Sequence, residues 1–405
     1  MNKEISRTRL RIILTVACVS LYLTAYLQDL VFEQSRGLSN RVAVSDVVPN
    51  VAGDTPEYSE QFVNEETPGK ISHVSSIAPL GGGDMAAVWY SGSQDSAPDV
   101  AIYYAECRRT TGPPGREYTW GEPRVLIDRE ICSKELSRFV RKVANPVLVR
   151  DGKKRLWLFY ASVLVGGWSG TSLNYKLSLD NGKSWGNSQK MILSPFFNLT
   201  HNVKNKALLL DDGSFLLPVY QEFIRRVSFL LHFAPDGGRP SYELIKMQTE
   251  GSAIQPSLIR EGPRQVLALF RGGDNGQVMM SRSADLGRTS LDFSSAPIPN
   301  PDSGLDAINA GDGVLLAVLN NKSFGRGTLS LMASTDGGGS WRAIKVLEHR
   351  EINLADLFQY REYSYPSINR SDDGRFHITY TYERRRIKHV VFNRAWLQEA
   401  LRGGA

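Results

Sequence analysis

The chain has few cysteines, few histidines and none of the common nucleotide-binding motifs. Its 405 residues include three cysteines and six histidines. No pair of histidines has the H-x-x-x-H spacing that places two metal ligands on one face of a helix. Neither a P-loop nor a nucleophile-elbow motif is present. We therefore expect no metal site and no nucleotide cofactor.

The cysteines allow at most one disulfide in the folded part of the chain. Cys18 lies in an apolar run near the N-terminus, which leaves Cys107 and Cys132 as the candidates. These two could pair if the domain is exported to an oxidising compartment. Two unpaired thiols are the alternative.

Charge is unevenly distributed along the chain. Residues 1–69 carry a net charge of −3 and residues 70–405 carry +9, which together give the formal charge of +6. A basic domain favours anionic partners, although scattered surface lysines and arginines would give the same total. Because the basic residues form no single stripe, we do not expect nucleic acid as a partner.

The N-terminus has the pattern of an export signal. Basic residues between Lys3 and Arg11 precede an apolar run from Ile12 to about Leu27. The run is short for a membrane-spanning helix, which needs about 20 residues. Because no clear small-x-small cleavage site follows, we predict a signal-anchor in residues 1–32, with a cleaved signal peptide as the alternative. An acidic linker over residues 33–70 would then hold the domain outside the cytoplasm, in the periplasm or at the cell surface.

Beyond the linker, short segments rich in β-branched and aromatic residues alternate with turns. Strands are expected at residues 86–90, 100–105, 156–161 and 215–220. Helical periodicity is limited to residues 133–143, where four apolar side chains could share one face.

Six segments share one repeated pattern, in which a strand opening is followed seven to nine residues later by a glycine. A second apolar strand follows most of these glycines, so each unit is expected to be a β-hairpin. The starts are 50 to 71 residues apart, which leaves room for two further strands and matches a propeller blade. The segments begin at Val74, Asn145, Asn205, Gln255, Asp306 and Tyr365, with glycines at Gly83, Gly152, Gly213, Gly262, Gly313 and Gly374.

A second repeat, S-x-D-x-G-x-x-W, runs out of phase with the first. Two copies are complete, at residues 178–185 and 334–341. A third copy, at residues 283–290, ends in serine instead of tryptophan, and residues 236–238 are a weaker remnant. We expect each aspartate to cap turn amides, each glycine to take positive φ and each tryptophan to pack over the turn. These residues are therefore structural, not catalytic.

These Asp-boxes resemble those of the sialidase (neuraminidase) superfamily, and the resemblance covers roughly residues 71–396. It implies an all-β, six-bladed propeller, followed here by a tail at residues 397–405. It also implies an exo-acting glycoside hydrolase on terminal acidic sugars. Sialidases hold the substrate carboxylate with three arginines and use a tyrosine as nucleophile. Many Asp-box propellers have other functions, so the resemblance alone does not establish activity.

The resemblance also assigns site residues to this chain. The nucleophile of the family's Y-S-S-L type of motif falls on Tyr365. The second and third arginines of the family fall on Arg271 and Arg326, and the glutamate that steadies the first arginine falls on Glu383. An acidic carbohydrate is the substrate that this set implies.

Two positions depart from the family pattern, and the loop acid has two candidates. His73 stands where the family carries its first arginine, and Gln255 stands where a glutamate assists the nucleophile. Glutamine cannot act as a base, whereas a histidine facing two arginines could act as an acid or a base. The loop acid falls on Asp95 or Asp99, and we favour Asp99.

The departures leave three functions open. The first is a sialidase-like exo-acting glycosidase, the second is a uronate-specific lyase on the same fold, and the third is a non-catalytic propeller that binds glycans or proteins. A run of three arginines at residues 384–386 is interpreted as part of a solvated strand face.

Overall fold

The computed structural model describes residues 12–20, 55–110, 117–164, 170–193, 201–222, 226–235, 240–249, 253–272, 276–289, 292–351 and 361–403. Residues 12–20 form a helix with exposed side chains. No helix among the described residues is both long and apolar enough to cross a membrane. Most of the predicted signal-anchor, residues 1–32, lies outside the described residues, so the anchor and the export of the chain stay predictions.

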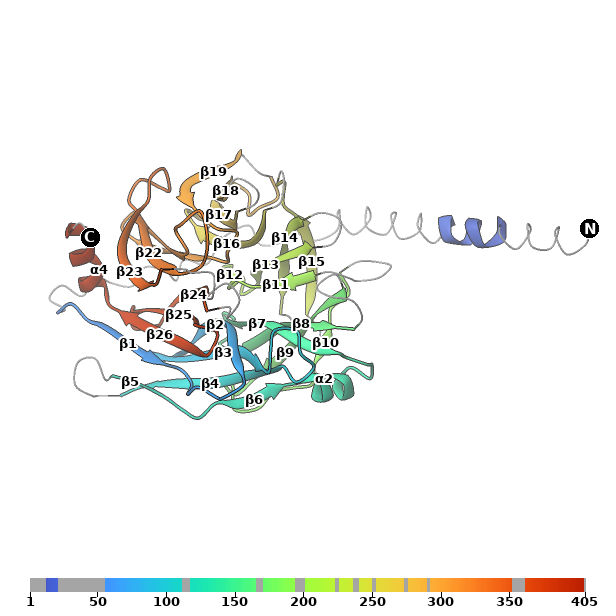
Figure 1. Cartoon of the computed structure of the whole chain (residues 1–405). Coiled ribbons are helices and arrows are strands. Elements are labelled where there is room, and N and C mark those ends of the chain that lie inside the picture. The colour runs from blue at the N-terminus through green and yellow to red at the C-terminus, as the bar shows by residue number, and fades with distance from the viewer. Residues whose placement is uncertain are drawn as a thin grey trace, which may run out of the picture. The chain divides into compact units, whose positions relative to one another are not determined.

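Residues 55–403 contain antiparallel sheets that form the six blades of a propeller (Figure 1). Blade one comprises β2 (Ile71–Gly81), β3 (Asp84–Gly92), β4 (Ala101–Arg109) and β5 (Tyr118–Trp120), with β6 (Arg124–Ile127) also paired to β4. Blade two comprises β7 (Lys142–Arg150), β8 (Leu156–Val163), β9 (Thr171–Ser178) and β10 (Gln189–Lys190). In blade three, β11 (His201–Val203) and β12 (Leu208–Leu209) both pair with β13 (Phe215–Glu222), which is followed by β14 (Arg226–Ala234) and β15 (Ser241–Lys246).

The remaining three blades have the same order of strands. Blade four comprises β16 (Ile254–Arg260), β17 (Val266–Arg271), β18 (Gln277–Ser283) and β19 (Asp292–Pro299). Blade five comprises β20 (Asp306–Gly311), β21 (Val314–Leu319), β22 (Thr328–Ser334) and β23 (Arg342–His349). Blade six comprises β24 (Tyr363–Arg370), β25 (Phe376–Tyr382), β26 (Arg386–Phe392) and, as its outer strand, β1 (Tyr58–Phe62). Each predicted glycine hairpin connects two paired strands of a blade, with Gly213 between β12 and β13 in blade three, which confirms the all-β, six-bladed propeller.

The propeller is closed by a strand that the sequence analysis placed in the acidic linker. β1 pairs antiparallel with β26, in a register from Tyr58 opposite Phe392 to Phe62 opposite Lys388. The last blade thus takes strands from both ends of the domain, and β1 pairs with the edge of β26 that would otherwise be open. The domain therefore begins before residue 71, and the linker prediction is wrong for these residues.

Two short helices flank the blades, and both differ from the sequence expectations. α2 (Arg129–Glu135) begins after Asp128, whose carboxylate accepts hydrogen bonds from two amides of the first turn. It ends before most of the predicted helical stretch at residues 133–143, because the buried strand β7 begins at Lys142. α4 (Arg394–Arg402) occupies most of the predicted tail, and its N-cap is Asn393.

Aromatic side chains fill the space between adjacent blades. Between blades two and three, the ring of Phe233 lies 4.9 Å from that of Phe215 and 5.3 Å from that of Phe159, measured between centroids. All three side chains are fully buried. Burying each one contributes about 1.5–3 kcal/mol to folding, so inter-blade packing is a main source of stability.

The Asp-boxes form the turns that the sequence predicted. In the first, Asp180 accepts hydrogen bonds from the amide of Ser184 and from the hydroxyl of Ser178. Gly182 has φ +93°, and the Trp185 indole donates to its carbonyl at 3.1 Å. The box at Asp336 repeats this geometry. The copy that starts at Ser283 keeps the aspartate bonds, whereas residues 236–238 lie outside the described residues.

The two candidate cysteines do not form a disulfide. Cys107 and Cys132 are both buried and both free. The Cys132 sulfur lies 3.3 Å from the Tyr160 hydroxyl, and burial raises the pKa of this thiol to about 11. The alternative of two unpaired thiols is therefore the correct one.

Candidate functional site

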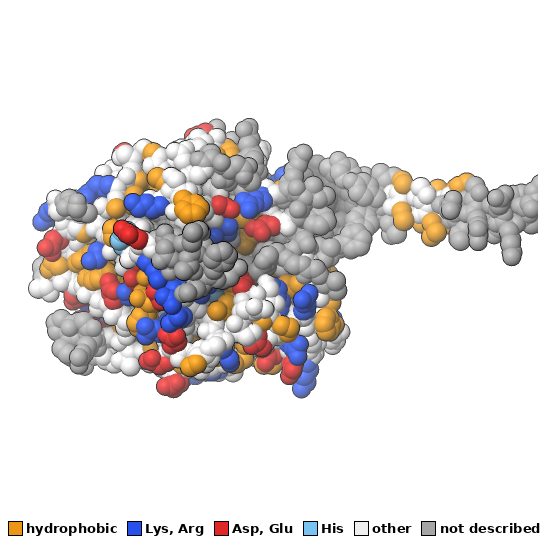
Figure 2. All heavy atoms as spheres, in the orientation of Figure 1, with side chains coloured by type: hydrophobic (Ala, Val, Ile, Leu, Met, Phe, Trp, Pro, Cys, Tyr) orange, Lys and Arg blue, Asp and Glu red, His pale blue; other side chains and the backbone are white. Residues whose placement is uncertain are grey.

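A charged cleft of about 1060 Å³ lies beside the turn that connects β25 and β26. Acidic and basic side chains are interspersed over the visible face of the propeller (Figure 2). The same mixture lines the cleft, which has five cationic residues and four carboxylates. The cations are Lys70, Arg326, Arg361, Arg384 and Arg385.

The inner strands of four blades bulge near their first residues, and the bulges position the candidate side chains. Val74, Asn145, Gln255 and Tyr365 each lie at a break in the register of β2, β7, β16 or β24. Their φ values lie between +49° and +54°, a region that side chains other than glycine rarely adopt. Bulges redirect side chains and often accompany functional sites. Backbone strain is thus concentrated where Gln255 and Tyr365 were predicted to act.

Tyr365 lies among three other predicted site residues. Its ring centroid is 4.8 Å from that of His73, and the guanidinium carbon of Arg326 lies 5.4 Å from the ring. Burial lowers the pKa of Arg271, but its electrostatic interaction with Tyr365 and its hydrogen bond to Asp302 together raise it above its ordinary value. The fold therefore brings residues from blades one, four, five and six into one cluster.

Asp302 holds the two predicted carboxylate-binding arginines next to each other. Its carboxylate accepts a hydrogen bond of 2.8 Å from Arg271 and an ion-pair contact of 3.4 Å from Arg226. Its backbone carbonyl accepts a bond of 3.2 Å from Arg326. Burial opposes ionisation, yet the bond from Arg271 lowers the pKa of Asp302. The carboxylate of Asp302 is therefore a charged support for Arg271, and its backbone carbonyl positions Arg326.

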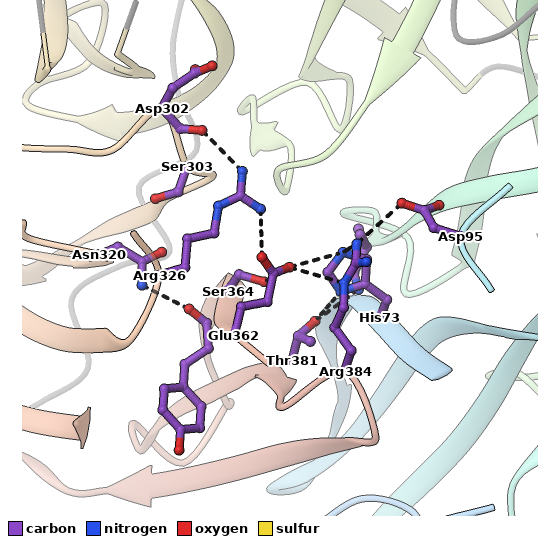
Figure 3. A network of polar contacts seen from close by, with 12 residues as sticks. His73, Asp95, Asp302, Ser303, Asn320, Arg326, Glu362, Ser364, Thr381 and Arg384 are labelled. Atoms are coloured by element: carbon purple, nitrogen blue, oxygen red, sulfur yellow. Dashed lines mark hydrogen bonds and ion pairs between the residues drawn. The ribbon is translucent and has the colours of Figure 1, made fainter. Parts of the chain in front are cut away.

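Glu362 connects Arg326 to a residue that the sequence analysis assigned elsewhere. Its carboxylate contacts Arg326 at 3.1 Å and the Nε atom of Arg384 at 3.3 Å, and it accepts a bond of 2.8 Å from Ser364 (Figure 3). The Arg384 side chain is 15% exposed. The interpretation of Arg384 as part of a solvated face is therefore wrong. No pattern in the sequence marks Glu362.

His73 is a buried, neutral member of this cluster. Its Nδ1 lies 3.0 Å from the Thr381 hydroxyl, and its Nε2 lies 3.0 Å from Nη2 of Arg384. Burial, followed by the positive charges of Arg384 and Arg326, holds the pKa of His73 well below its ordinary value. The carboxylate of Glu362 is 3.5 Å from Nε2, but this contact is not an ion pair because the imidazole is uncharged.

Gln255 lies near Tyr365 but is bonded to a different tyrosine. Its amide donates to the Tyr220 hydroxyl at 3.1 Å. A Cβ atom at Gly304 would come within 3.1 Å of both the Gln255 oxygen and the Tyr365 ring, so the two side chains pack against the same glycine. Among the described residues, no carboxylate lies within hydrogen-bond distance of the Tyr365 hydroxyl.

Two predicted site residues, Asp99 and Glu383, do not contact the cluster around Tyr365. Asp99 is exposed, and its carboxylate accepts bonds from the amide and the hydroxyl of Ser93 at 2.9 Å. Asp95, the other candidate, accepts a bond from Tyr90 and lies 3.3 Å from Arg384. The geometry therefore favours Asp95 over Asp99.

Glu383 likewise does not support the position of His73. It pairs with Arg350 at 3.0 Å, whereas Glu362 contacts both cluster arginines. Within the described part of the chain, no group of three histidine, cysteine or carboxylate side chains could hold a metal ion.

Comparison with solved structures places the fold among sialidases at low sequence identity. The Hadza microbial sialidase Hz136 is 15% identical, with a TM-score of 0.61 over 79% of this chain and 65% of that one. The intramolecular trans-sialidase from Ruminococcus gnavus is 16% identical, with a TM-score of 0.60 over 80% and 95%. A Dyadobacter fermentans protein of unknown function is 14% identical, with a TM-score of 0.63 over 83% and 98%.

These likenesses show the fold, and this chain spans only about two thirds of the Hadza enzyme. No curated protein matches the sequence. The family model of the BNR repeat-like domain matches residues 83–378, which is most of the propeller. The chain therefore belongs to the BNR repeat-like domain family.

Proposed function

We propose that this propeller is a sialidase-like, exo-acting glycosidase that binds the carboxylate of a terminal acidic sugar. The observation that carries the proposal is the meeting of Arg271 and Arg326, from separate blades, beside Tyr365. The planar guanidinium group of arginine matches a carboxylate in bidentate geometry, and two such groups side by side suit one carboxylate ligand. Structural neighbours that are named sialidases and trans-sialidases support an acidic sugar as the ligand.

In this proposal Tyr365 is the nucleophile. Its phenol would give its proton to solvent water as the phenol oxygen forms a bond to the anomeric carbon, while the glycosidic C–O bond breaks and the leaving oxygen takes a proton from Asp95. Water would then attack the anomeric carbon and give one proton to Asp95, and the released phenolate of Tyr365 would take a proton back from solvent. A phenol suits an anionic sugar because a carboxylate nucleophile would repel it. The surrounding guanidinium groups would stabilise the phenolate as it forms.

A second candidate function is a propeller that binds acidic glycans without turning them over. The side chain of Gln255 favours it. Gln255 cannot accept the phenol proton, and its amide is already bonded to Tyr220. Elimination on a uronate would need a base near the sugar, and the Nε2 lone pair of His73 already accepts a bond from Arg384. The lyase alternative therefore requires another base, which could be Tyr365 or a carboxylate of the cleft such as Asp95.

A glycan panel separates these functions. The full chain is incubated with sialylated and uronate-terminated oligosaccharides, and released sialic acid and unsaturated uronate are measured separately. Free sialic acid or free saturated uronate supports the glycosidase, and unsaturated product supports the lyase. Binding without any product supports the non-catalytic propeller.

The Tyr365→Phe variant then tests the role of the nucleophile. It removes one oxygen, so we expect turnover to fall by about 100-fold or more while glycan binding persists. Tyr103→Phe, an equivalent change on β4, is the control and should keep full activity. Equal activities of the two variants would exclude Tyr365 as the nucleophile.

A further inference from the structure

Blade one supplies a histidine where a sialidase-like site would carry an arginine, and a different arginine reaches the same place. Arg384 lies in the turn between β25 and β26, on blade six, and its side chain extends to His73 on β2 (Figure 3). The two residues are 311 positions apart in the sequence. Spatial proximity, and not the sequence pattern, therefore identifies Arg384 as a member of the site.

The turn that carries Arg384 is strained. Glu383 and Arg384 have φ values of +50° and +56°, and the turn closes with a bond of 3.0 Å from the Arg385 amide to the Tyr382 carbonyl. Two successive positive φ values are usual for Asn-Gly or Gly-Gly in a hairpin. Residues other than glycine rarely adopt this region, and such a conformation persists only where the surroundings enforce it. The strained turn aims the guanidinium group of Arg384 into the cleft.

The hydrogen-bond roles of His73 follow from those of its partners. Arginine can only donate, so Nε2 of His73 must be the acceptor in its 3.0 Å contact with Arg384. The single proton of the neutral imidazole then lies on Nδ1 and is donated to the Thr381 hydroxyl at 3.0 Å. The hydroxyl oxygen of Thr381 also accepts from the amide of Val74, which fixes its place in the sheet.

Glu362 links this pair to the rest of the anion site. One carboxylate contacts Arg384 at 3.3 Å and Arg326 at 3.1 Å, so the two guanidinium groups are held around it. Asp95 contacts Arg384 from the side of blade one at 3.3 Å. Arg384 is thus fixed by contacts to His73, Glu362 and Asp95, which come from three separate segments of the chain.

We propose that Arg384 is the third guanidinium group of the acidic-sugar site and that neutral His73 is the positioning residue that orients it. This inference rests on the proposed function, because it assigns Arg384 to the same carboxylate as Arg271 and Arg326. It replaces the earlier hypothesis that His73 itself acts as the acid or base. A side chain that accepts from arginine cannot also deliver a proton from Nε2.

Binding of matched probes tests the role of Arg384. The probes are N-acetylneuraminic acid, its uncharged methyl ester and D-glucuronic acid, titrated against the full chain. Arg384→Ala should weaken binding of the acids by about 10- to 100-fold, the usual range for a lost charged hydrogen bond, and should leave the ester unchanged. Arg108→Ala, at an exposed arginine of β4 that pairs with Asp84 and does not line the cleft, is the control and should change neither.

Substitutions of His73 separate positioning from a merely structural role. His73→Leu removes the acceptor and should lose nearly as much affinity for the acids as Arg384→Ala. His73→Gln keeps an acceptor within reach of Arg384 and should recover most of it. The double variant His73→Arg with Arg384→Ala returns a guanidinium group to blade one and should bind the acids more tightly than Arg384→Ala alone.

The histidine can also be examined without any ligand. In ¹⁵N NMR of the wild-type chain, His73 should show a protonated Nδ1 and an unprotonated Nε2, and it should stay neutral well below pH 6.5. Its charged neighbours are Glu362, Arg384 and Arg326. In Arg384→Ala the pKa of His73 should rise, because one cation has been removed.

The outcomes distinguish the inference from the function on which it depends. If neither acid binds the wild-type chain, the proposed acidic-sugar site is wrong and the inference fails with it. If the acids bind and Arg384→Ala binds them equally well, only the role of Arg384 is overturned. A protonated Nε2 on His73 would overturn the positioning role, whatever the probes show.

Discussion

The Asp-box turns and the arginine cluster are both polar networks, but they are built over very different distances along the chain. In an Asp-box, hydrogen bonds join residues two to four positions apart, as from Ser178 and Ser184 to Asp180. In the cluster, Arg384 contacts a histidine 311 positions away, and Arg326 contacts a glutamate 36 positions away. A local network leaves a pattern in the sequence, whereas a long-range network exists only after the blades have assembled.

The two networks also differ in how deeply their charged side chains are buried. The Asp-box carboxylates are solvated at the ends of hairpins. Each turn therefore contributes only modestly to the stability of the fold, and the contribution is repeated in several blades. The carboxylates and cations of the arginine cluster are more enclosed, so removing one partner leaves the other uncompensated. Substitutions in the long-range network should therefore cost more than substitutions in the local one.

The largest effect is expected for Asp306→Ala, in a second buried network of long-range contacts that lies apart from the arginine cluster. Asp306 is fully buried and accepts bonds from Lys206 at 2.8 Å, Ser257 at 2.6 Å and the amide of Ile368 at 2.9 Å. Removing the Asp306 carboxylate leaves the Lys206 ammonium without its counter-ion, so the free energy of unfolding should fall by about 3–5 kcal/mol. Denaturant titration measures this loss. Asp312→Ala, at a largely exposed carboxylate paired with Arg394, is the control, and a similar loss in both would contradict the account.

A smaller effect is expected at the glycine of an Asp-box. A Cβ atom at Gly182 would overlap the Tyr104 hydroxyl, and φ is +93°. Gly213 has a similar φ of +83°, but a Cβ atom there would meet nothing within 4 Å. Gly182→Ala should therefore cost about 1–3 kcal/mol more than Gly213→Ala, since only the first is overpacked. Equal losses of thermal stability would show that backbone strain alone accounts for the glycine.

A pH-dependent effect is expected from the buried histidines of blade six. The Trp120 indole donates to Nδ1 of His389, so His389 donates from Nε2 to Nδ1 of His377 at 3.0 Å. Burial, followed by the charges of Arg375 and Arg109, lowers the pKa of His377 to about 3. The unfolded chain takes up this proton near pH 6.5, so the stabilisation is complete above that pH and is lost as pH falls toward 3.

His377→Gln tests this dependence. Between about pH 6 and pH 4 the wild-type chain should lose about 1 kcal/mol per pH unit more than the variant does. Denaturant titration at each pH gives the two slopes. Parallel slopes would show that His377 is protonated equally in the folded and unfolded chains.

The smallest effect is expected for the acidity of an Asp-box. The hydroxyl of Ser184, with its amide, lowers the pKa of Asp180 to about 2, and Ser340 does the same for Asp336. Ser184→Ala should raise the pKa of Asp180 toward 3.8 and leave Asp336 unchanged as an internal control. Carboxyl NMR titration in acid measures both. An unchanged Asp180 would mean that the backbone amides alone set its pKa.

The fold was largely predictable because its signals are local. Glycine hairpins such as the one at Gly313, and the Asp-boxes, each complete their contacts within a few residues. β1 was missed because the segment Tyr58–Phe62 is polar and only half-buried. An outer strand of a blade contacts the sheet on one side only, so it needs no continuous apolar pattern.

The candidate site was predictable only in part. Arg271, Arg326, His73 and Tyr365 were identified because a family pattern marks their positions, and they do meet. Arg384 was assigned to a solvated face because its burial depends on His73 and Glu362, which are distant in the sequence. The choice between Asp95 and Asp99 depended on which carboxylate the loop turns toward Arg384, and no sequence pattern reports that direction.

The most direct test of the account compares an acidic sugar with its own ester on two matched arginines. N-Acetylneuraminic acid and its methyl ester are titrated against the wild-type chain, Arg326→Met and Arg350→Met. Arg326 and Arg350 are similarly exposed and each pairs with one glutamate, at 3.1 and 3.0 Å. We predict that the wild-type chain binds the acid more tightly than the ester and that only Arg326→Met abolishes this difference. Equal affinity of the wild-type chain for acid and ester would contradict a carboxylate site beside Tyr365.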